Sequence, residues 1–241
     1  MKKFFERNFF ISLCHPFNRK KRRELRYNIN LRYKNEIHQV FLEKSPKALL
    51  KLSELINNYD KPIKVWLEFG TLLGYYRENG IISHDEDIDF GIEESENVHD
   101  FICYLNRNGF KLSKMYTIKS QENSCLEDFI AEYNVKFEQY VSIDFFVFKT
   151  KNSKKYSYHF DEPIDKIKPY KFIVNQIEMS DFGLIEGNFL GGKFFTPHNI
   201  EKHLSSIYGR DFMTPKKYSY QDRDKNNEIV LPHCYAVKKD F

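Results

Sequence analysis

"GTLLGYYRENGIISHDEDIDFGI", Gly70 to Ile92, carries the most specific pattern of the chain. A small-residue turn opens it, a helical segment follows, and an acid-rich run then alternates Asp87 and Asp89 with apolar residues. In a β-strand the side chains at i and i+2 point to the same face, whereas a helix would set them about 200° apart. A site shared by both carboxylates therefore predicts a strand here.

The residues around the turn predict a strand followed by a helix. "IKVWLEFG", Ile63 to Gly70, begins with an apolar, β-branched alternation that is typical of a strand, and "TLLGYYREN" continues as a helix. Gly70 and Thr71 would then place backbone N–H groups and a hydroxyl at a helix N-terminus, which is a natural cradle for a phosphate. Arg77 lies about two helical turns farther on, where a guanidinium can add a bidentate phosphate contact; a surface salt bridge is the alternative.

A third acid comes from farther along the chain. "EDFIAEYNV" and "YVSIDFFVF" predict two strands in an antiparallel pair, and Asp144 interrupts the apolar run of the second. Asp87, Asp89 and Asp144 fit a clamp for one or two divalent cations, and hard oxygen ligands of this type suit Mg²⁺ or Mn²⁺. Asp144 is either a further metal ligand or the base that takes a substrate proton. A polar surface turn without a metal is the alternative for an isolated D-x-D.

Other segments carry helix signals. Three helices are predicted: one capped by Ser45 with Pro46 in its first turn, one ending at Gly109, and one capped by Thr196, with Pro197 next, that ends at Gly209.

Composition bounds the class of protein. With 241 residues, 41% of them hydrophobic, the chain can bury one substantial core. Its four cysteines are scattered, which predicts free thiols rather than a zinc site or a disulfide framework. No apolar run reaches the roughly 18 to 20 residues of a membrane span. We therefore expect a globular cytoplasmic protein.

The net charge of +4 is concentrated near the N-terminus. "NRKKRRELR", Asn18 to Arg26, carries six basic residues behind an aromatic segment. Residues 1–27 fit a peripheral contact with an anionic membrane surface, on the inner face of the membrane, and they equally fit a solvated basic tail. No nucleic-acid-binding motif is present. We predict a basic, aromatic segment over 1–40 and a catalytic domain over 41–241.

Two motifs carry a resemblance to a known family. "WLEFGTLLGYYRENGIISHDEDIDFGI", Trp66 to Ile92, resembles the signature of the fukutin, fukutin-related and LicD phosphotransferases, and "FFTPHNIEKHLSSIYGRDFMTP" resembles their closing helix. Ser83 and His84 stand where that family usually has proline and an aromatic residue, and Phe69 replaces the first of a common glycine pair.

The resemblance implies a fold and a reaction. The fold is α+β, with a nucleotidyltransferase-like mixed β-sheet flanked by helices. The reaction is an Mg²⁺-dependent phosphotransfer that moves phosphoribitol, glycerol phosphate or phosphocholine from a CDP-linked alcohol to a hydroxyl of a glycan or lipid-linked oligosaccharide, and releases CMP. Such transfer would modify a surface polysaccharide, such as capsule or lipopolysaccharide. Asp87, Asp89 and Asp144 take the metal role, and Gly70, Thr71 and Arg77 bind substrate.

Two other functions compete with this interpretation. A glycosyltransferase can use D-x-D to hold a nucleotide sugar, but the Gly-Thr-Leu-Leu-Gly unit upstream favours the nucleotidyltransferase fold. A non-catalytic, membrane-tethered scaffold is the second alternative, and the intact acidic triad counts against it, because a scaffold would lose nothing by losing an acid.

Overall fold

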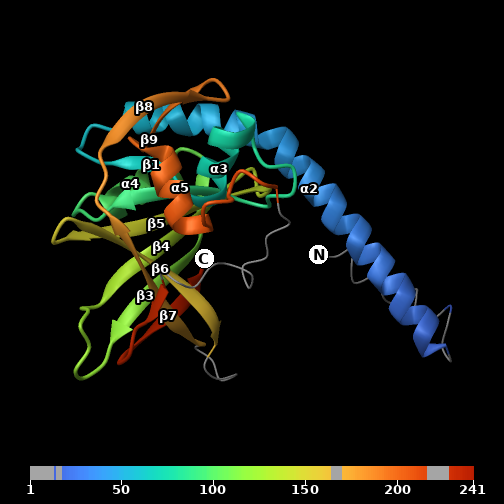
Figure 1. Ribbon diagram of the computed structural model, residues 1–241. Helices are drawn as coiled ribbons and strands as arrows, with labels where there is room; N and C mark the ends of the chain where they lie inside the picture. The colour runs from blue at the N-terminus through green and yellow to red at the C-terminus, as the bar shows by residue number, and fades with distance from the viewer. Residues whose placement is uncertain (1–13, 15–17, 164–169, 216–227) are drawn as a thin grey trace. The chain divides into compact units, whose positions relative to one another are not determined.

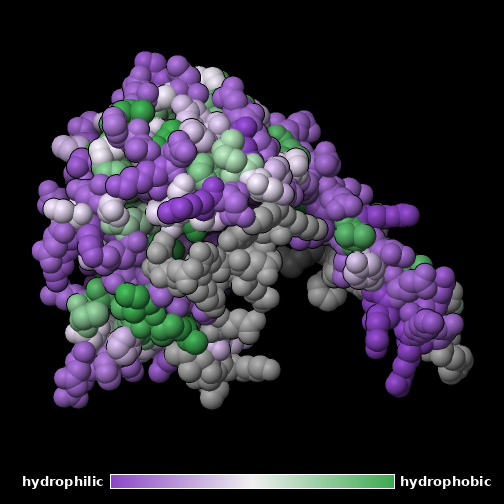
Figure 2. Space-filling model, viewed as in Figure 1, coloured by the Kyte–Doolittle hydropathy of each residue, from purple (hydrophilic) through white to green (hydrophobic). Residues whose placement is uncertain are grey.

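The computed structural model describes residues 14, 18–163, 170–215 and 228–241, and the chain divides into two compact units, 1–43 and 44–241. Most of the aromatic N-terminal segment, residues 1–13 and 15–17, lies outside the described residues, so its membrane contact stays a prediction. The described part of the smaller unit is mainly hydrophilic (Figure 2). Among the helices that the structure describes, none has the length and apolar character needed to cross a membrane.

Helix α2 (Arg19–Asn57) is continuous through Pro46, so the prediction of a helix start at Ser45 was wrong. The residues before Ser45 are themselves helical, so no free helix N-terminus exists there for this side chain to cap. A proline inside a helix removes one backbone hydrogen bond. Ala48, Leu49 and Leu52, which follow it, are fully buried, and this burial offsets the loss.

The larger unit is built on one sheet, ordered β10-β7-β11-β3-β4-β5-β2-β1-β9-β8 (Figure 1). Its strands are β1 (Val65–Leu67), β2 (Ile88–Glu93), β3 (Phe110–Ser120), β4 (Phe129–Phe137), β5 (Val141–Lys151), β6 (Lys154–Pro163), β7 (Lys171–Ser180), β8 (Leu184–Phe189), β9 (Gly192–Pro197), β10 (Glu228–Val230) and β11 (Cys234–Asp240). The predicted antiparallel pairing of β4 with β5 is confirmed. β2 pairs antiparallel with β1 and parallel with β5, so the sheet is mixed.

Part of the sheet closes on itself. Strand β6 pairs with β5 and β7, and the pairing continues through β11, β3 and β4 back to β5. This ring of strands, in the lower half of Figure 1, encloses a core of its own. Its buried residues are Ile118, Ala131, Tyr158, Val174, Leu231, Cys234 and Ala236. The predicted mixed arrangement of helices and strands is confirmed, and the closed ring is an addition to it.

Three further helices lie in the larger unit: α3 (Phe69–Glu78), α4 (Val98–Arg107) and α5 (Ile200–Tyr208). Gly209 is the C-cap of helix α5, as predicted. The N-cap is Asn199, whose side chain accepts a hydrogen bond from the Lys202 N–H at 2.9 Å. The predicted cap, Thr196, is instead buried in strand β9, where it pairs with Ile185 of β8. Its backbone is committed to the sheet, so the helix starts later.

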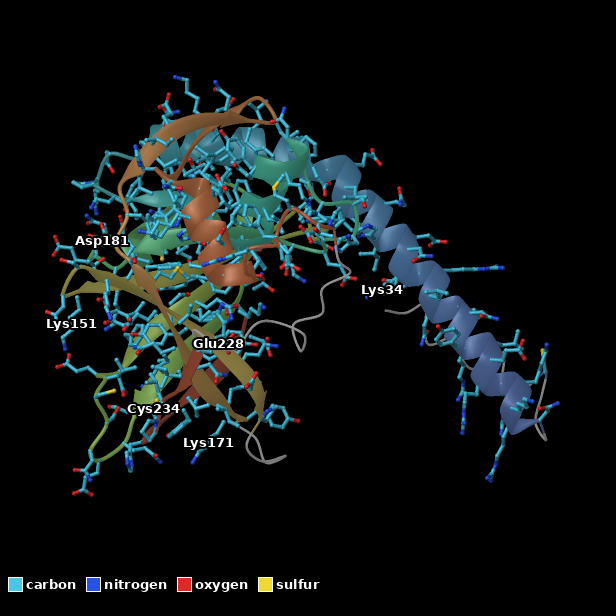
Figure 3. All side chains as sticks on the ribbon, viewed as in Figure 1. Lys34, Lys151, Lys171, Asp181, Glu228 and Cys234 are labelled. Atoms are coloured by element: carbon cyan, nitrogen blue, oxygen red, sulfur yellow. The ribbon has the colours of Figure 1, made fainter. Side chains whose placement is uncertain are left out.

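The four cysteines are free thiols, as predicted. Cys14 and Cys125 are exposed, while Cys234 is buried at the start of β11 (Figure 3). Cys103 lies on α4, with its Sγ 3.8 Å from Nε2 of His99.

Candidate active site

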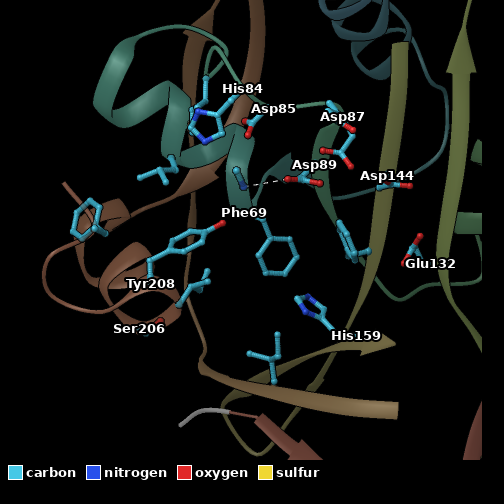
Figure 4. Close-up of a pocket in the computed structure, with 18 of the residues that line it drawn as sticks. Phe69, His84, Asp85, Asp87, Asp89, Glu132, Asp144, His159, Ser206 and Tyr208 are labelled. Carbon is cyan, nitrogen blue, oxygen red and sulfur yellow. Dashed lines mark hydrogen bonds between the residues drawn. The ribbon is translucent and has the colours of Figure 1, made fainter. Parts of the chain in front are cut away.

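Strand pairing brings the three predicted acids together. The parallel register of β2 and β5 sets Asp89 directly beside Asp144, and Asp87 lies one residue before β2 begins. One carboxylate oxygen from each acid lies within 4.8 Å of the others. The three side chains stand next to one another in Figure 4. The cluster opens into a cavity of about 530 Å³.

Helix α3 holds Asp89 through its first turn. The Gly70 N–H donates to Oδ2 of Asp89 at 3.1 Å (dashed line in Figure 4), and the Asp89 N–H donates to Oγ1 of Thr71 at 2.8 Å. The backbone of Glu68 also donates to the carbonyl of Asp89 at 3.1 Å. Gly70 is therefore engaged with the carboxylate of Asp89 and Thr71 with its backbone N–H, and their role as a phosphate cradle stays a prediction.

Gly70 leaves little room for a side chain. A Cβ at this position would lie 3.2 Å from Oδ2 of Asp89 and 3.3 Å from Oδ2 of Asp85. We expect the added methyl group of Gly70→Ala to displace these carboxylates by a few tenths of an ångström. Mn²⁺ binding should then weaken by about 10-fold, which is the usual effect of disturbing a group that contacts a metal ligand. Electron paramagnetic resonance of bound Mn²⁺ measures this. Gly183→Ala is the matched control, because its Cβ would meet nothing within 4 Å; equal affinities in both variants would contradict the expectation.

Asp144 is oriented by two residues that sequence reasoning missed. The Asn134 side-chain amide donates to Oδ1 of Asp144 at 2.6 Å, and Nζ of Lys114 lies 3.8 Å from the same oxygen. Among the described residues, none bonds to Oδ2. Oδ2 is therefore the oxygen left for a cation. Lys114 also pairs with the buried Glu132, at 3.5 Å.

The acids crowd one another electrostatically. Asp87 is an exposed residue, but desolvation of its carboxyl group by the cavity walls, and then the charges of Asp144 and Asp85, raise its pKa to about 7. Burial raises the pKa of Asp89 well above its usual range, and the charges of Asp87 and Asp144 add to this. Burial and the charge of Asp144 raise the pKa of Glu132 to about 8. A divalent cation would relieve this repulsion, and a set of carboxylate oxygens is what Mg²⁺ and Mn²⁺ prefer. The residues therefore fit such an ion.

These raised pKa values predict that the metal-free protein becomes less stable as the pH rises. The ordinary pKa values are 3.8 for Asp87 and 4.5 for Glu132, so the folded state keeps protons that the unfolded chain releases. Stability that is complete below these ordinary values is lost as pH rises through about 7 and 8. In EDTA we expect the thermal unfolding temperature to fall between about pH 5 and pH 8, and the slope to be smaller in Glu132→Gln. A slope identical in the variant would contradict the assignment.

Arg77 lines the same cavity but is partly engaged. Its side chain is buried, its Nη2 pairs with Glu78 at 2.7 Å, and its Nη1 lies 3.5 Å from the carbonyl of Phe212. The structure thus gives Arg77 both a place on the cavity wall and a salt bridge with Glu78. A contact with substrate phosphate stays a prediction.

Phe69 explains one departure from the family pattern. It has a left-handed backbone, with φ of +43°, which a glycine adopts without strain. Its buried ring packs edge-on against Phe146 and His159, with ring centroids 4.9 Å and 5.0 Å away. The phenylalanine therefore adopts a strained backbone conformation, and its ring forms part of the aromatic wall of the cavity. On the opposite side, Ser206 and Tyr208 of α5 line the cavity (Figure 4).

A buried hydrogen-bonded pair, Glu68 and His203, joins helix α5 to the start of helix α3. Glu68, fully buried, caps α3 and accepts from the Trp66 indole and from the His203 ring, both at 2.6 Å. His203 belongs to α5, three residues before Ser206. The pair therefore ties both walls of the cavity together. Sequence reasoning missed it because its members are 135 residues apart.

Comparison with known proteins agrees with this site. The family model "LicD/FKTN/FKRP, nucleotidyltransferase domain" matches residues 62–199. A Rickettsia typhi protein named as uncharacterised is 26% identical over 215 residues, 79% of this chain and 66% of its own length. Human ribitol-5-phosphate transferase FKTN is 26% identical over 184 residues, 76% of this chain but 36% of the transferase. The chain thus spans less than two thirds of the length of these relatives. The matched family region includes all three acids and covers more than half of the chain, so this protein belongs to the LicD/FKTN/FKRP family.

Proposed function

We propose that the protein is a metal-dependent phosphotransferase of nucleotidyltransferase-like fold that moves a phospho-alcohol from a CDP-linked donor to a glycan hydroxyl. Family members are phosphotransferases that act on glycans, and one relative is named for transfer of ribitol 5-phosphate. The observation that carries the proposal is the meeting of Asp87, Asp89 and Asp144 at one end of a cavity of about 530 Å³.

The residues suggest how the reaction proceeds. A divalent cation at the three acids would neutralise charge on the donor diphosphate. The acceptor oxygen bonds to the phosphorus that carries the alcohol, the bond from that phosphorus to the bridging oxygen breaks, and CMP leaves. The acceptor proton passes to a pocket carboxylate, for which Asp144 and Glu132 are the candidates. Arg77, which lines the cavity, would contact a phosphate oxygen.

The acceptor is proposed to be a surface glycan or a lipid-linked oligosaccharide. The N-terminal part of α2 carries a run of basic residues, Arg19 to Arg23, which would hold the protein near an anionic membrane that presents such an acceptor. This contact is independent of the chemistry at the acids.

The test measures CMP release from CDP-ribitol, CDP-glycerol and CDP-choline, with Mg²⁺ or EDTA and with glycan extracts as acceptors. We expect metal-dependent CMP from one of the donors, which would name the alcohol. No CMP from any donor in the presence of acceptor would reject the proposed donor class. A nucleotide sugar that is consumed instead would establish the glycosyltransferase alternative.

A further inference from the structure

A second cavity of the larger unit, of about 560 Å³, carries an excess of positive charge. Four lysines line it, and we call it the lysine pocket: Lys47 and Lys51 of α2, Lys111 of β3 and Lys136 of β4. Glu138 is the acid among its described lining residues. Phe241 lines the cavity as well, and even if its backbone carboxylate is counted, two negative charges face four ammonium groups.

Glu138 is moreover shared. It accepts from Nζ of Lys47 at 2.8 Å and from Nζ of Lys44 at 2.5 Å. These hydrogen bonds hold the pKa of Glu138 at about 2, so it is charged under ordinary conditions. Its charge is therefore shared between Lys44 and Lys47. Among the described residues, no side-chain carboxylate of the pocket forms an ion pair with Lys51, Lys111 or Lys136.

Lys111 and Lys136 oppose one another directly across strands β3 and β4. Like charges at directly opposite positions of an antiparallel pair repel. Nζ of Lys111 donates to a neutral carbonyl, that of Asn106, at 3.1 Å. Among the described residues, no carboxylate forms an ion pair with Lys136. An anion between the two ammonium groups would turn this repulsion into attraction.

Lys51 is half-buried beneath them, packed on aromatic rings. Its Nζ lies 6.0 Å from the ring centroid of Phe110 and 5.7 Å from that of Phe137. A Cβ placed on Gly109 would come within 2.9 Å of this nitrogen, so the ammonium group is pressed against the backbone. Among the described residues, none offers it a carboxylate partner. A partly desolvated cation without a counter-charge favours binding of an anion.

The lysine pocket adjoins the acidic cluster along β4. Lys136 follows Asn134 by two residues, so both side chains lie on one face of the strand, about 7 Å apart along it. Asn134 donates to Asp144. The charge of Lys136 is among the causes that oppose the raised pKa of Asp144. A phosphate held by Lys136 would therefore lie on the strand face that also carries Asn134, the partner of Asp144.

We propose that the lysine pocket binds a phosphate group carried by the acceptor. This inference rests on the proposed phosphotransfer and narrows its acceptor to an anionic one. Two sources share this chemistry: a phosphorylated glycan and the phosphate of a lipid. Lysines suit a phosphate group because each ammonium group donates hydrogen bonds to phosphate oxygens without requiring a fixed planar geometry.

The test measures binding in EDTA, so that no cation at the acids contributes and no turnover is needed. Glucose 6-phosphate is titrated calorimetrically as the glycan probe, and phosphatidylglycerol vesicles, compared with phosphatidylcholine vesicles, serve as the lipid probe. The variant is Lys51→Gln combined with Lys136→Gln. The matched control is Lys151→Gln combined with Lys171→Gln, two exposed lysines outside the pocket (Figure 3) that remove the same charge.

We expect the pocket variant to bind one of the probes at least about 10-fold more weakly than the wild type, since two charge-assisted contacts are lost, and the control to bind normally. Loss confined to glucose 6-phosphate identifies a glycan phosphate, and loss confined to the vesicles identifies a lipid phosphate. Unchanged binding of both probes, or an equal loss in the control, overturns the inference. Pocket-dependent binding in a protein that releases no CMP would keep the inference of a phosphate site and reject the proposed transfer.

Discussion

Asp87→Asn is expected to reduce Mn²⁺ affinity and turnover together, each by at least about 100-fold, because it removes a proposed ligand rather than an outer contact. The amide keeps the size of the side chain but removes its charge. Asp87 also contributes to the raised pKa of Asp89, so its loss relieves repulsion in the metal-free protein. We therefore expect a folded variant whose thermal unfolding temperature in EDTA, at about pH 8, is no lower than that of the wild type.

The control for this variant is Asp60→Asn, which neutralises an exposed acid outside the cavity. It is expected to keep both Mn²⁺ binding and CMP release. Near-normal Mn²⁺ affinity in Asp87→Asn would refute the metal role of this residue, whatever the activity. Normal affinity with lost CMP release would instead assign Asp87 to substrate.

His203→Ala is expected to lower the free energy of unfolding by about 3 kcal/mol, because it leaves the carboxylate of Glu68 buried without one of its donors. Glu68 is fully buried and the side chain of His203 is 4% exposed, so water cannot easily replace the lost contact. Urea unfolding monitored by circular dichroism measures the change. His203→Gln, which retains a side-chain donor, should lose less.

Lys193→Ala provides the comparison, since it breaks an ion pair with Glu186 in which the two side chains are 61% and 52% exposed. A pair in water contributes less than about 1 kcal/mol. If His203→Ala destabilised the protein no more than Lys193→Ala, the buried pair would not hold the two walls of the cavity together.

Short-range patterns predicted the parts of the site that lie within single elements. The period of two in "DIDFGI" placed Asp87 and Asp89 on one side, and the lone acid in "YVSIDFFVF" marked Asp144. Glu132 and Asn134 carried the same signal, because both interrupt the apolar run "FIAEYNV" at a spacing of two. Polar residues on one face of a buried strand were thus visible in the sequence, and so was the strand that carries Asp144, but the pairing with β3 was not.

Other features depend on long-range pairing. Lys114 follows a register shift between Leu112 and Lys114, so the regular alternation of β3 does not predict that its side chain reaches Asp144. Pro46 and Thr196 gave helix-start signals that the neighbouring structure overrode, since one already lay in a helix and the other in a sheet. Local chemistry sets a preference at such positions, and tertiary contacts decide the outcome.

The closed ring of strands bears on how the protein is synthesised. Its final member, β11, joins β3 to β7, so a nascent chain that lacks β11 exposes two unpaired strand edges. Strand β5, which carries Asp144, belongs to this ring and also pairs with β2, which lies outside the ring. Closure of the ring around Asp144 therefore has to await β11, which follows the other members of the ring in the chain, and before that the two strand edges are open to intermolecular pairing.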